Sequence, residues 1–80
     1  MRLYLLTRKG QTDYDEFDSC LVCAIDEKDA IEIHPEDKPF NPTEKYSTWV
    51  SDRNLIDCKY IGESDQDIPR GVVISSYNAG

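Results

Sequence analysis

The residues whose side chains could act as nucleophiles or metal ligands are three cysteines and one histidine, at Cys20, Cys23, Cys58 and His34. Cys20 and Cys23 have the C-x-x-C spacing, which in a turn is typical of a metal knuckle or a redox pair. They fall inside an apolar run that predicts a strand, where side chains three positions apart point to opposite faces of a sheet. We therefore expect that the two thiols cannot converge on one metal ion or one disulfide.

A catalytic or metal site built around His34 lacks further support. A zinc site made of the three cysteines and His34 has suitable ligand types but no second paired motif. A Cys–His nucleophile pair would need a third orienting group and an oxyanion loop, and the sequence indicates neither. His34 directly precedes Pro35, a position that favours a role at the C-terminus of a helix. We predict no catalytic residue, no metal and no cofactor, with a Cys/His-based activity as the alternative.

The acidic balance is the most informative feature of the composition. The 80 residues include 16 Asp and Glu against 9 Lys and Arg, which gives a formal net charge of −7. Such a surface repels nucleic-acid phosphates and anionic lipids, so we expect no direct nucleic-acid or membrane binding and a partner that is itself basic. Acids two apart on an extended segment project to one side about 6.6–6.8 Å apart, close to every second phosphate along one DNA strand. An acidic face can therefore act as a DNA mimic in a basic nucleic-acid channel.

The predicted partner-binding residues form three acidic groups with aromatic anchors nearby. The acids precede the second strand, lie along and after the helix, and precede the last strand: Asp13, Asp15, Glu16, Asp18, Asp29, Glu32, Glu36, Asp37, Glu63, Asp65 and Asp67. The predicted apolar anchors are Tyr14, Phe17 and Trp49. The alternative for each acidic group is that loop carboxylates are merely solvated and that helical carboxylates complement the helix dipole.

One stretch predicts two elements and the junction between them. Ser19–Ile25 is a short apolar run with β-branched residues, which predicts a largely buried strand. Asp26 stands where a helix N-cap is expected, and Asp29 follows three residues later in a capping-box-like position. We expect a helix over Glu27–His34, ended by Pro35 because proline cannot donate to the helical hydrogen-bond ladder.

Three further strands are predicted at Arg2–Arg8, Leu55–Gly62 and Gly71–Tyr77. Apolar residues on both faces of the first strand indicate a central position in the sheet. The resulting order is β-β-α-β-β, an α+β fold with a four-stranded, largely antiparallel sheet and one short helix packed on one face. A chain of 80 residues makes a single domain, near the size at which one core is barely sufficient.

A single helix leaves one face of the sheet without a cover. The residues expected on that second face are Tyr4, Leu6, Val73 and Tyr77. The residues of the third strand expected to face the helix are Ile56, Cys58 and Tyr60. In the proline-rich crossing after the helix, Phe40 and Tyr46 are the expected anchors, and Trp49 should pack across the open end of the core.

We expect the chain to reside in the cytosol. Its N-terminal apolar segment is too short for a signal peptide, and no stretch approaches the ~20 apolar residues of a membrane span. Three cysteines, an odd number in such a chain, fit reduced thiols better than a disulfide framework.

Several segments along nearly the whole chain resemble one class of proteins. They are RLYLL, YDEFDS, the strand–helix join CAIDEKDA with the following IHP, the lone Trp-Val pair, YIGES and the closing GVVISSYNAG. In these segments the chain resembles small uncharacterised accessory proteins encoded by bacteriophages and prophages. Several small acidic phage proteins of similar size inhibit host immunity, anti-CRISPR proteins among them. The resemblance therefore implies an anti-defence protein in the cytoplasm of the host bacterium, and none of its motifs is a catalytic signature.

We thus predict a non-enzymatic, anti-CRISPR-like inhibitor that binds a basic or nucleic-acid-binding surface of a host defence complex. One alternative is a homodimeric structural or interaction module that buries the uncovered sheet face and has no host target. Another is a protein that sequesters a small signalling ligand. An anionic ligand would require the basic residues to cluster in space: Arg2, Arg8, Lys9, Arg53 and Arg70.

Overall fold

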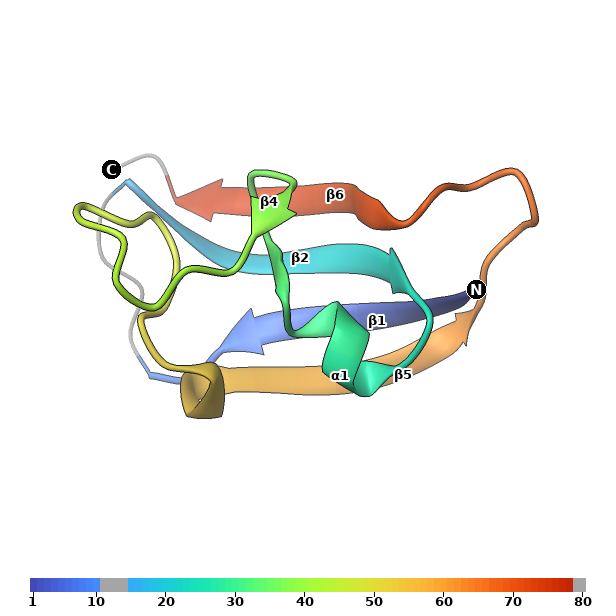
Figure 1. Cartoon of the computed structure of the whole chain (residues 1–80), viewed down its shortest axis with the longest axis horizontal. Helices are drawn as coiled ribbons and strands as arrows, with labels where there is room; N and C mark the ends of the chain where they lie inside the picture. The colour runs from blue at the N-terminus through green and yellow to red at the C-terminus, as the bar shows by residue number, and fades with distance from the viewer. Residues whose placement is uncertain (11–14, 79–80) are drawn as a thin grey trace.

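The computed structural model describes residues 1–10 and 15–78, which form a four-stranded antiparallel sheet with one short α-helix (Figure 1). The strands of this sheet are β1 (Arg2–Arg8), β2 (Glu16–Ala24), β5 (Ile56–Glu63) and β6 (Gly71–Asn78). The smaller elements are α1 (Glu27–Ala30), the paired strands β3 (Ile33–His34) and β4 (Lys38–Pro39), and the 3-10 helix η1 (Arg53–Leu55). The predicted α+β class is confirmed.

β1 lies inside the sheet, whose strand order is β5-β1-β2-β6. It pairs antiparallel with β2 on one side and with β5 on the other, so the predicted central position is confirmed. β2 begins earlier than predicted because Glu16 and Phe17 pair with Asn78 and Tyr77 at the end of β6. β1 and β2 are thus the two inner strands of the sheet, and β5 and β6 are its edges.

α1 is a single helical turn that begins where the sequence predicts. The Asp26 side chain accepts a hydrogen bond from the Asp29 amide at 2.8 Å. The Asp29 side chain in turn accepts a hydrogen bond from the Ile25 amide at 3.0 Å. The first bond satisfies an amide that the N-terminus of the helix would otherwise leave without a partner, and the second ties the first turn to the residue before the cap.

The helix ends at Ala30, and the predicted extension to His34 is wrong. Residues Ile33 and His34 instead form β3, which pairs with β4 in a small hairpin that buries both side chains. An isolated two-turn helix is only marginally stable, so this pairing and burial prevail over helical propensity. Pro35 lies in the hairpin turn and terminates no helix. Neither helix in residues 1–10 and 15–78 is long and apolar enough to cross a membrane.

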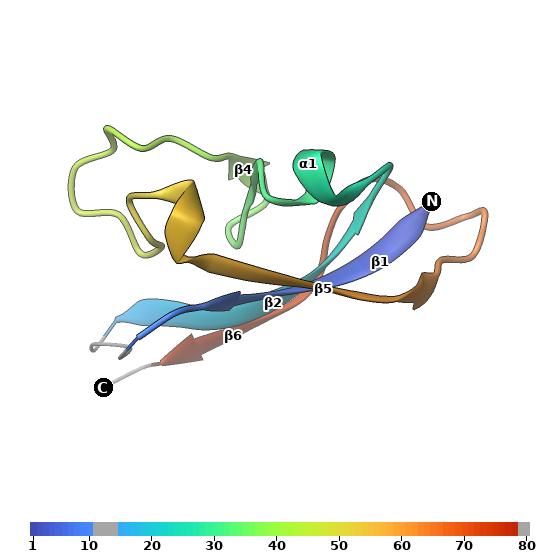
Figure 2. The same cartoon turned by 90° about the horizontal axis from the view of Figure 1, so that it is seen from below.

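One face of the sheet is covered by α1, the β3–β4 hairpin and the irregular crossing that follows it (Figure 2). The core between these layers includes Tyr4, Leu6, Cys20, Val22, Ile33, Phe40, Trp49, Val50 and Ile56. Cys58 packs against this core, as predicted, and the Tyr60 ring lies 5.8 Å from that of Tyr4. Phe40 anchors the crossing as predicted, whereas Tyr46 sits in a turn with φ 57° and is fully exposed. The prediction of Tyr46 as an anchor is therefore wrong.

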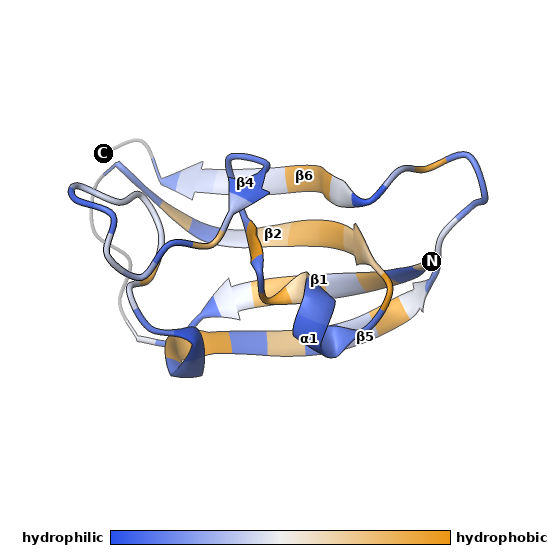
Figure 3. Cartoon of the chain, in the orientation of Figure 1, coloured by the Kyte–Doolittle hydropathy of each residue, from blue (hydrophilic) through white to orange (hydrophobic). Residues whose placement is uncertain are grey.

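On the opposite face of the sheet, which we call the open face, residues 1–10 and 15–78 form no second layer over most of its length (Figure 2). The register places Leu5 of β1 beside Leu21 of β2, and Leu21 beside Ile74 of β6. The hydropathy colouring shows the apolar stretches of these strands (Figure 3). Cys23 points to the same face and is buried where the β5–β6 connection passes over the end of the sheet.

Two residues predicted for the open face lie on the covered face instead. Tyr4 and Leu6 are buried in the core opposite Val22 and Cys20. In β1 both alternating sets of side chains are apolar, so the sequence pattern could not distinguish the two faces. The choice follows from where α1 and the hairpin pack.

Of the other two residues predicted for the open face, Tyr77 also differs from that expectation. The Tyr77 ring lies 4.9 Å from that of Phe17, which in turn contacts the ring of His34 at 6.5 Å. Tyr77 therefore belongs to the covered side of β6. Val73 stands at a register shift between β2 and β6 and is partly exposed.

Replacing Leu6 with alanine should lower the free energy of unfolding by about 2–5 kcal/mol, because the side chain is fully buried. The matched control is Leu5→Ala in the same strand, which should cost clearly less because Leu5 is only half-buried on the open face. Urea denaturation followed by the fluorescence of Trp49 measures both values. An equal or larger cost at Leu5 would contradict the assignment of the core to the covered face.

Candidate partner-binding surface

The helical acids of the predicted partner surface are held in ion pairs. Asp29 binds the Arg70 guanidinium at 2.7 Å, and Glu32 binds the Arg53 guanidinium at 2.7 Å. Hydrogen bonds from these arginines lower the pKa of both carboxyl groups. The two pairs tie the layer over the sheet to η1 and to the residue before β6, so the charge of these acids is compensated within the fold.

A second charged cluster surrounds the buried side chain of His34. Its Nδ1 accepts a hydrogen bond from the Glu36 amide at 3.0 Å, and its Nε2 has no hydrogen-bond partner among the described residues. Lys38 Nζ lies 3.3 Å from the Glu36 carboxylate and 2.5 Å from that of Glu44. The other oxygen of Glu44 lies 3.8 Å from His34 Nε2. Because Nδ1 is an acceptor, the neutral ring carries its proton on Nε2.

The predicted role of His34 at a helix C-terminus is wrong, because the residue lies in β3. Its ring nitrogen Nδ1 accepts a hydrogen bond from the Glu36 amide in the turn of the same hairpin. Burial lowers the pKa of the ring, and the charge of Lys38 acts in the same direction. With Nδ1 accepting and Nε2 protonated, neither nitrogen offers a lone pair to a metal ion. Within residues 1–10 and 15–78, no group of three or more His, Cys, Asp or Glu is arranged to hold a metal.

The three cysteines occupy separate environments. Cys20 belongs to the core of the covered face, whereas Cys23 points to the open face, where its Sγ lies 3.2 Å from Ser64 Oγ. The predicted separation of the two thiols is therefore confirmed. Burial raises the pKa of Cys20 to about 12 and that of Cys58 to about 11. Thiols with such pKa values stay protonated near neutral pH, whereas the thiolate is the nucleophilic form.

The acids at the start of β2 are partly engaged within the fold. Glu16 forms an ion pair with Arg8 at 3.1 Å. Asp18 accepts a hydrogen bond from the Ser19 hydroxyl at 3.1 Å. Asp15 is exposed, and its φ of 60° places it in a turn before the strand. Of these predicted residues, Asp15 is the most accessible to a partner.

The predicted aromatic anchors are not fully accessible where the structure describes them. Trp49 is only 3% exposed, and the Arg8 guanidinium lies over its ring at 5.7 Å from the centroid. Phe17 is partly buried against the core. The predicted residues Asp13 and Tyr14 lie outside the described residues.

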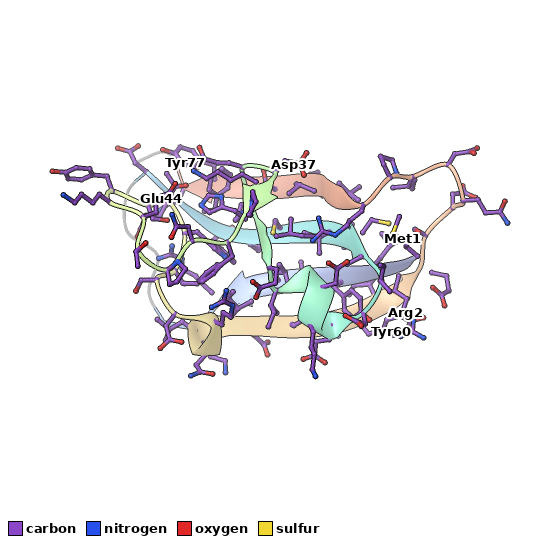
Figure 4. The ribbon with its side chains drawn as sticks, viewed as in Figure 1. Met1, Arg2, Asp37, Glu44, Tyr60 and Tyr77 are labelled. Carbon is purple, nitrogen blue, oxygen red and sulfur yellow. The ribbon has the colours of Figure 1, made fainter. Side chains whose placement is uncertain are left out.

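Asp37 is tied to the start of β6 (Figure 4). Its Oδ1 accepts a hydrogen bond from the Val72 amide at 2.9 Å. Gly71 has a φ of 137°, and a Cβ atom at this position would lie 2.6 Å from the same oxygen. The close approach of the Asp37 carboxylate to β6 thus depends on a glycine at position 71.

The third predicted acidic group stands apart from the others. Glu63, Asp65 and Asp67 are exposed at the junction of β5 with the β5–β6 connection, and none of them lies within ion-pair distance of a basic group that the structure describes. Glu63 stands opposite Arg2 of β1 and attracts its charge at longer range. We call these three residues the acidic connection. They lie at the end of the sheet that holds the N-terminus, whereas β2 begins at the other end (Figure 1).

The backbone of the acidic connection is fixed by contacts with distant residues. The amide and the hydroxyl of Ser64 both donate to the Met1 carbonyl at 2.9 Å. Ser64 Oγ also contacts the Cys23 thiol, and the Ile68 amide donates to the Asp65 carbonyl at 3.2 Å. The sequence carries no local signal for these bonds, because Met1 and Ser64 are 63 positions apart. The exposed carboxylates therefore project from an ordered segment.

A hollow beside the acidic connection is lined by Arg2, Tyr4, Glu27, Tyr60 and Glu63. Arg2 and Tyr60 lie at the same end of the molecule as Met1 (Figure 4). Tyr60 is 52% exposed and shares this hollow with two carboxylates. A cationic side chain of a partner could stack on such a ring. Our sequence-based site omitted Tyr60 and Glu27, since neither carries a signal that places it beside Glu63.

The structure thus divides the predicted partner residues into two classes. Asp29, Glu32, Glu36 and Asp37 have partners within the fold, whereas the acidic connection presents its carboxylates to solvent. No known protein family, curated protein or solved structure matches this chain.

The stability of the fold should fall as the pH is lowered from about 7 to about 5. Burial lowers the folded-state pKa of His34 below the 6.5 of an exposed histidine, so the unfolded chain binds more protons in this range and stability rises with pH. This contribution is complete above pH 6.5 and is lost as the pH falls from there through the folded-state pKa. Chemical denaturation at a series of pH values measures the slope.

A control variant, His34→Gln, should flatten the slope between about pH 7 and pH 5. It should keep the further loss below pH 4.5, where carboxyls with lowered pKa such as Glu32 become protonated. A wild-type stability that stays flat or rises on acidification from neutral pH would contradict a neutral, buried His34.

Proposed function

We propose that this chain is a non-catalytic, phage-encoded inhibitor that binds a basic surface of a bacterial protein through the acidic connection. The observation that carries the proposal is that Glu63, Asp65 and Asp67 are exposed on one ordered segment, where Arg2 is the one basic residue of the described chain whose charge interacts with any of them. A surface that normally binds nucleic acid has the complementary charge. The resemblance to phage accessory proteins supports a host defence complex as the target, with an anti-CRISPR-like role in the cytoplasm of the host bacterium.

The acidic connection would contribute more to the rate of association than to the final affinity. An exposed ion pair contributes about 0.2–1 kcal/mol, whereas complementary fields accelerate encounter and depend steeply on salt. Tight binding needs buried aromatic or aliphatic contacts as well. Tyr60 and Ile61, which are 52% and 48% exposed, precede the acidic connection on β5 and are suited to this role. The hydrogen bonds of Ser64 to Met1 reduce the entropy lost when the carboxylates are ordered on binding.

Sequestration of a small anionic ligand has less support. That alternative requires several cationic side chains to converge on one site. Arg8, Arg53 and Arg70 pair respectively with Glu16, Glu32 and Asp29. Because each guanidinium has its own carboxylate, these arginines do not form a shared anion site.

A tagged form of the chain should retain a nucleic-acid-binding protein from a bacterial lysate at low salt and release it at high salt. Combining Glu63→Gln, Asp65→Asn and Asp67→Asn should weaken the affinity for that protein by about tenfold, since three exposed charge interactions are lost. Mass spectrometry of the eluate identifies the retained protein. Titration of the purified protein gives the affinity, and a competition assay shows whether the chain displaces its nucleic acid.

The matched control combines Asp29→Asn, Glu32→Gln and Glu44→Gln, which removes the same number of negative charges from residues that have ion-pair partners. This variant should keep most of the wild-type affinity once thermal melting shows that it is folded. Equal weakening by both triple variants would mean that net charge acts without a defined site. Recovery of the bait alone, or retention that salt does not change, would contradict the proposal.

A further inference from the structure

The two edges of the sheet differ in their protection against pairing with another strand. β5 carries the charged residues Asp57, Lys59 and Glu63. Charges on an edge strand discourage the addition of a further strand. β6, the opposite edge, has no charged residue and no proline over its eight residues. β6 is therefore the edge that lacks this protection.

β6 also exposes apolar side chains. Ile74 is 65% exposed, and Val73 and Tyr77 are each nearly half exposed. At the start of this edge the Val72 amide donates a hydrogen bond to the Asp37 carboxylate at 2.9 Å. The following residues, 73–77, are exposed. An uncharged, apolar edge segment of this kind is a template for another β-strand.

We infer that β6 is the docking edge for the β6 strand of a second copy of this chain, in an antiparallel pair that extends the sheet to eight strands. The distribution of charge favours contact between two copies at the β6 edge over contact at the β5 edge, because β5 carries charged residues and β6 does not. Each copy has a net charge of −7, so two copies repel each other least where the strands that meet carry no charge of their own. Additional burial would also supplement the small core of an 80-residue chain.

Symmetry limits the register of this pair. A twofold axis perpendicular to the sheet keeps the open faces of both copies on one side. Residues directly opposite each other in an antiparallel pair point to the same face, and side chains alternate between faces with a period of two. The axis must therefore pass through a pair formed by one residue and the same residue of the second copy. We place Ile74 there, since it lies beside Leu21, and Leu21 lies beside Leu5, on the open face. The apolar rows of the two copies then form one continuous surface.

The same register predicts the effect of salt. With Ile74 on the axis, Gly71 of one copy faces Tyr77 of the second copy. Asp37 lies against Gly71, and Asp15 interacts with Tyr77, so each end of the interface brings acids from the two copies together. Salt screens this repulsion and should strengthen the dimer. The sign is opposite to that expected for binding to a basic partner.

Sedimentation velocity of the full chain at tens to hundreds of micromolar, in low and high salt, tests the inference. We expect a monomer–dimer equilibrium that shifts toward dimer at high salt. Ile74→Glu should raise the dissociation constant by more than about tenfold, because it opposes two carboxylates on the axis and removes two apolar contacts. The matched control, Ile61→Glu, adds the same charge at a partly exposed residue of β5 and should dimerise as the wild type does.

A second control separates edge pairing from stacking of the open faces. Lys59→Glu changes the open face of β5, beside Leu5, and should leave the dimer intact. Amide hydrogen exchange of the wild type should show protection of β6, and not of β5, that grows with protein concentration. This readout remains valid if Ile74→Glu fails to fold.

A wild type that stays monomeric at hundreds of micromolar in high salt overturns the inference. A dimer that persists in the Ile74→Glu variant also overturns it, as does the loss of the dimer in the Lys59→Glu variant. These outcomes leave the proposed function untouched, since capture of a basic partner depends on the acidic connection and weakens with salt.

Discussion

The pairing of β1 with both β2 and β5 is the constraint on which the rest of the molecule depends. Both faces of β1 are apolar, and this register aligns Tyr4 and Leu6 with Val22 and Cys20 under a second layer. That layer is thin, with a one-turn helix and a hairpin whose two strands have two residues each. Its position is secured by apolar contacts and by ion pairs that reach from it to distant segments. The same register leaves the other face of the sheet open.

The charges of the molecule therefore serve two purposes. Acids near the hairpin and helix are matched with arginines or with Lys38, and they stabilise the thin layer. Acids on the β5–β6 connection have no matched ion pair in the described residues, and they leave exposed carboxylates at one end of the sheet. The uncharged edge at β6 lies apart from this arrangement. An acidic end for a basic partner and a neutral edge for a second copy are compatible, because they use different surfaces of one small sheet.

Local signals in the sequence were sufficient for the fold class and for most strand positions. Short runs rich in apolar residues and bounded by polar or turn residues located β1, β5 and β6, because such runs are local features of the sequence. Asp26 and Asp29 located the start of α1, because N-capping is an interaction between residues only a few positions apart. The opposed cysteines of the C-x-x-C pair followed from strand geometry alone. Net charge, a property of composition, was likewise determined.

Only the tertiary structure decided the features that depend on distant residues. The helix ends early because β3 pairs with β4 and buries His34, which no local pattern indicates. The partners of Asp29 and Glu32 lie 41 and 21 positions away, so the sequence could not show that these acids are compensated. The faces of β1 were ambiguous because both are apolar. By itself, then, the sequence determined the elements and the amount of charge, whereas long-range packing decided which carboxylates, and which strand edge, remain available to a partner.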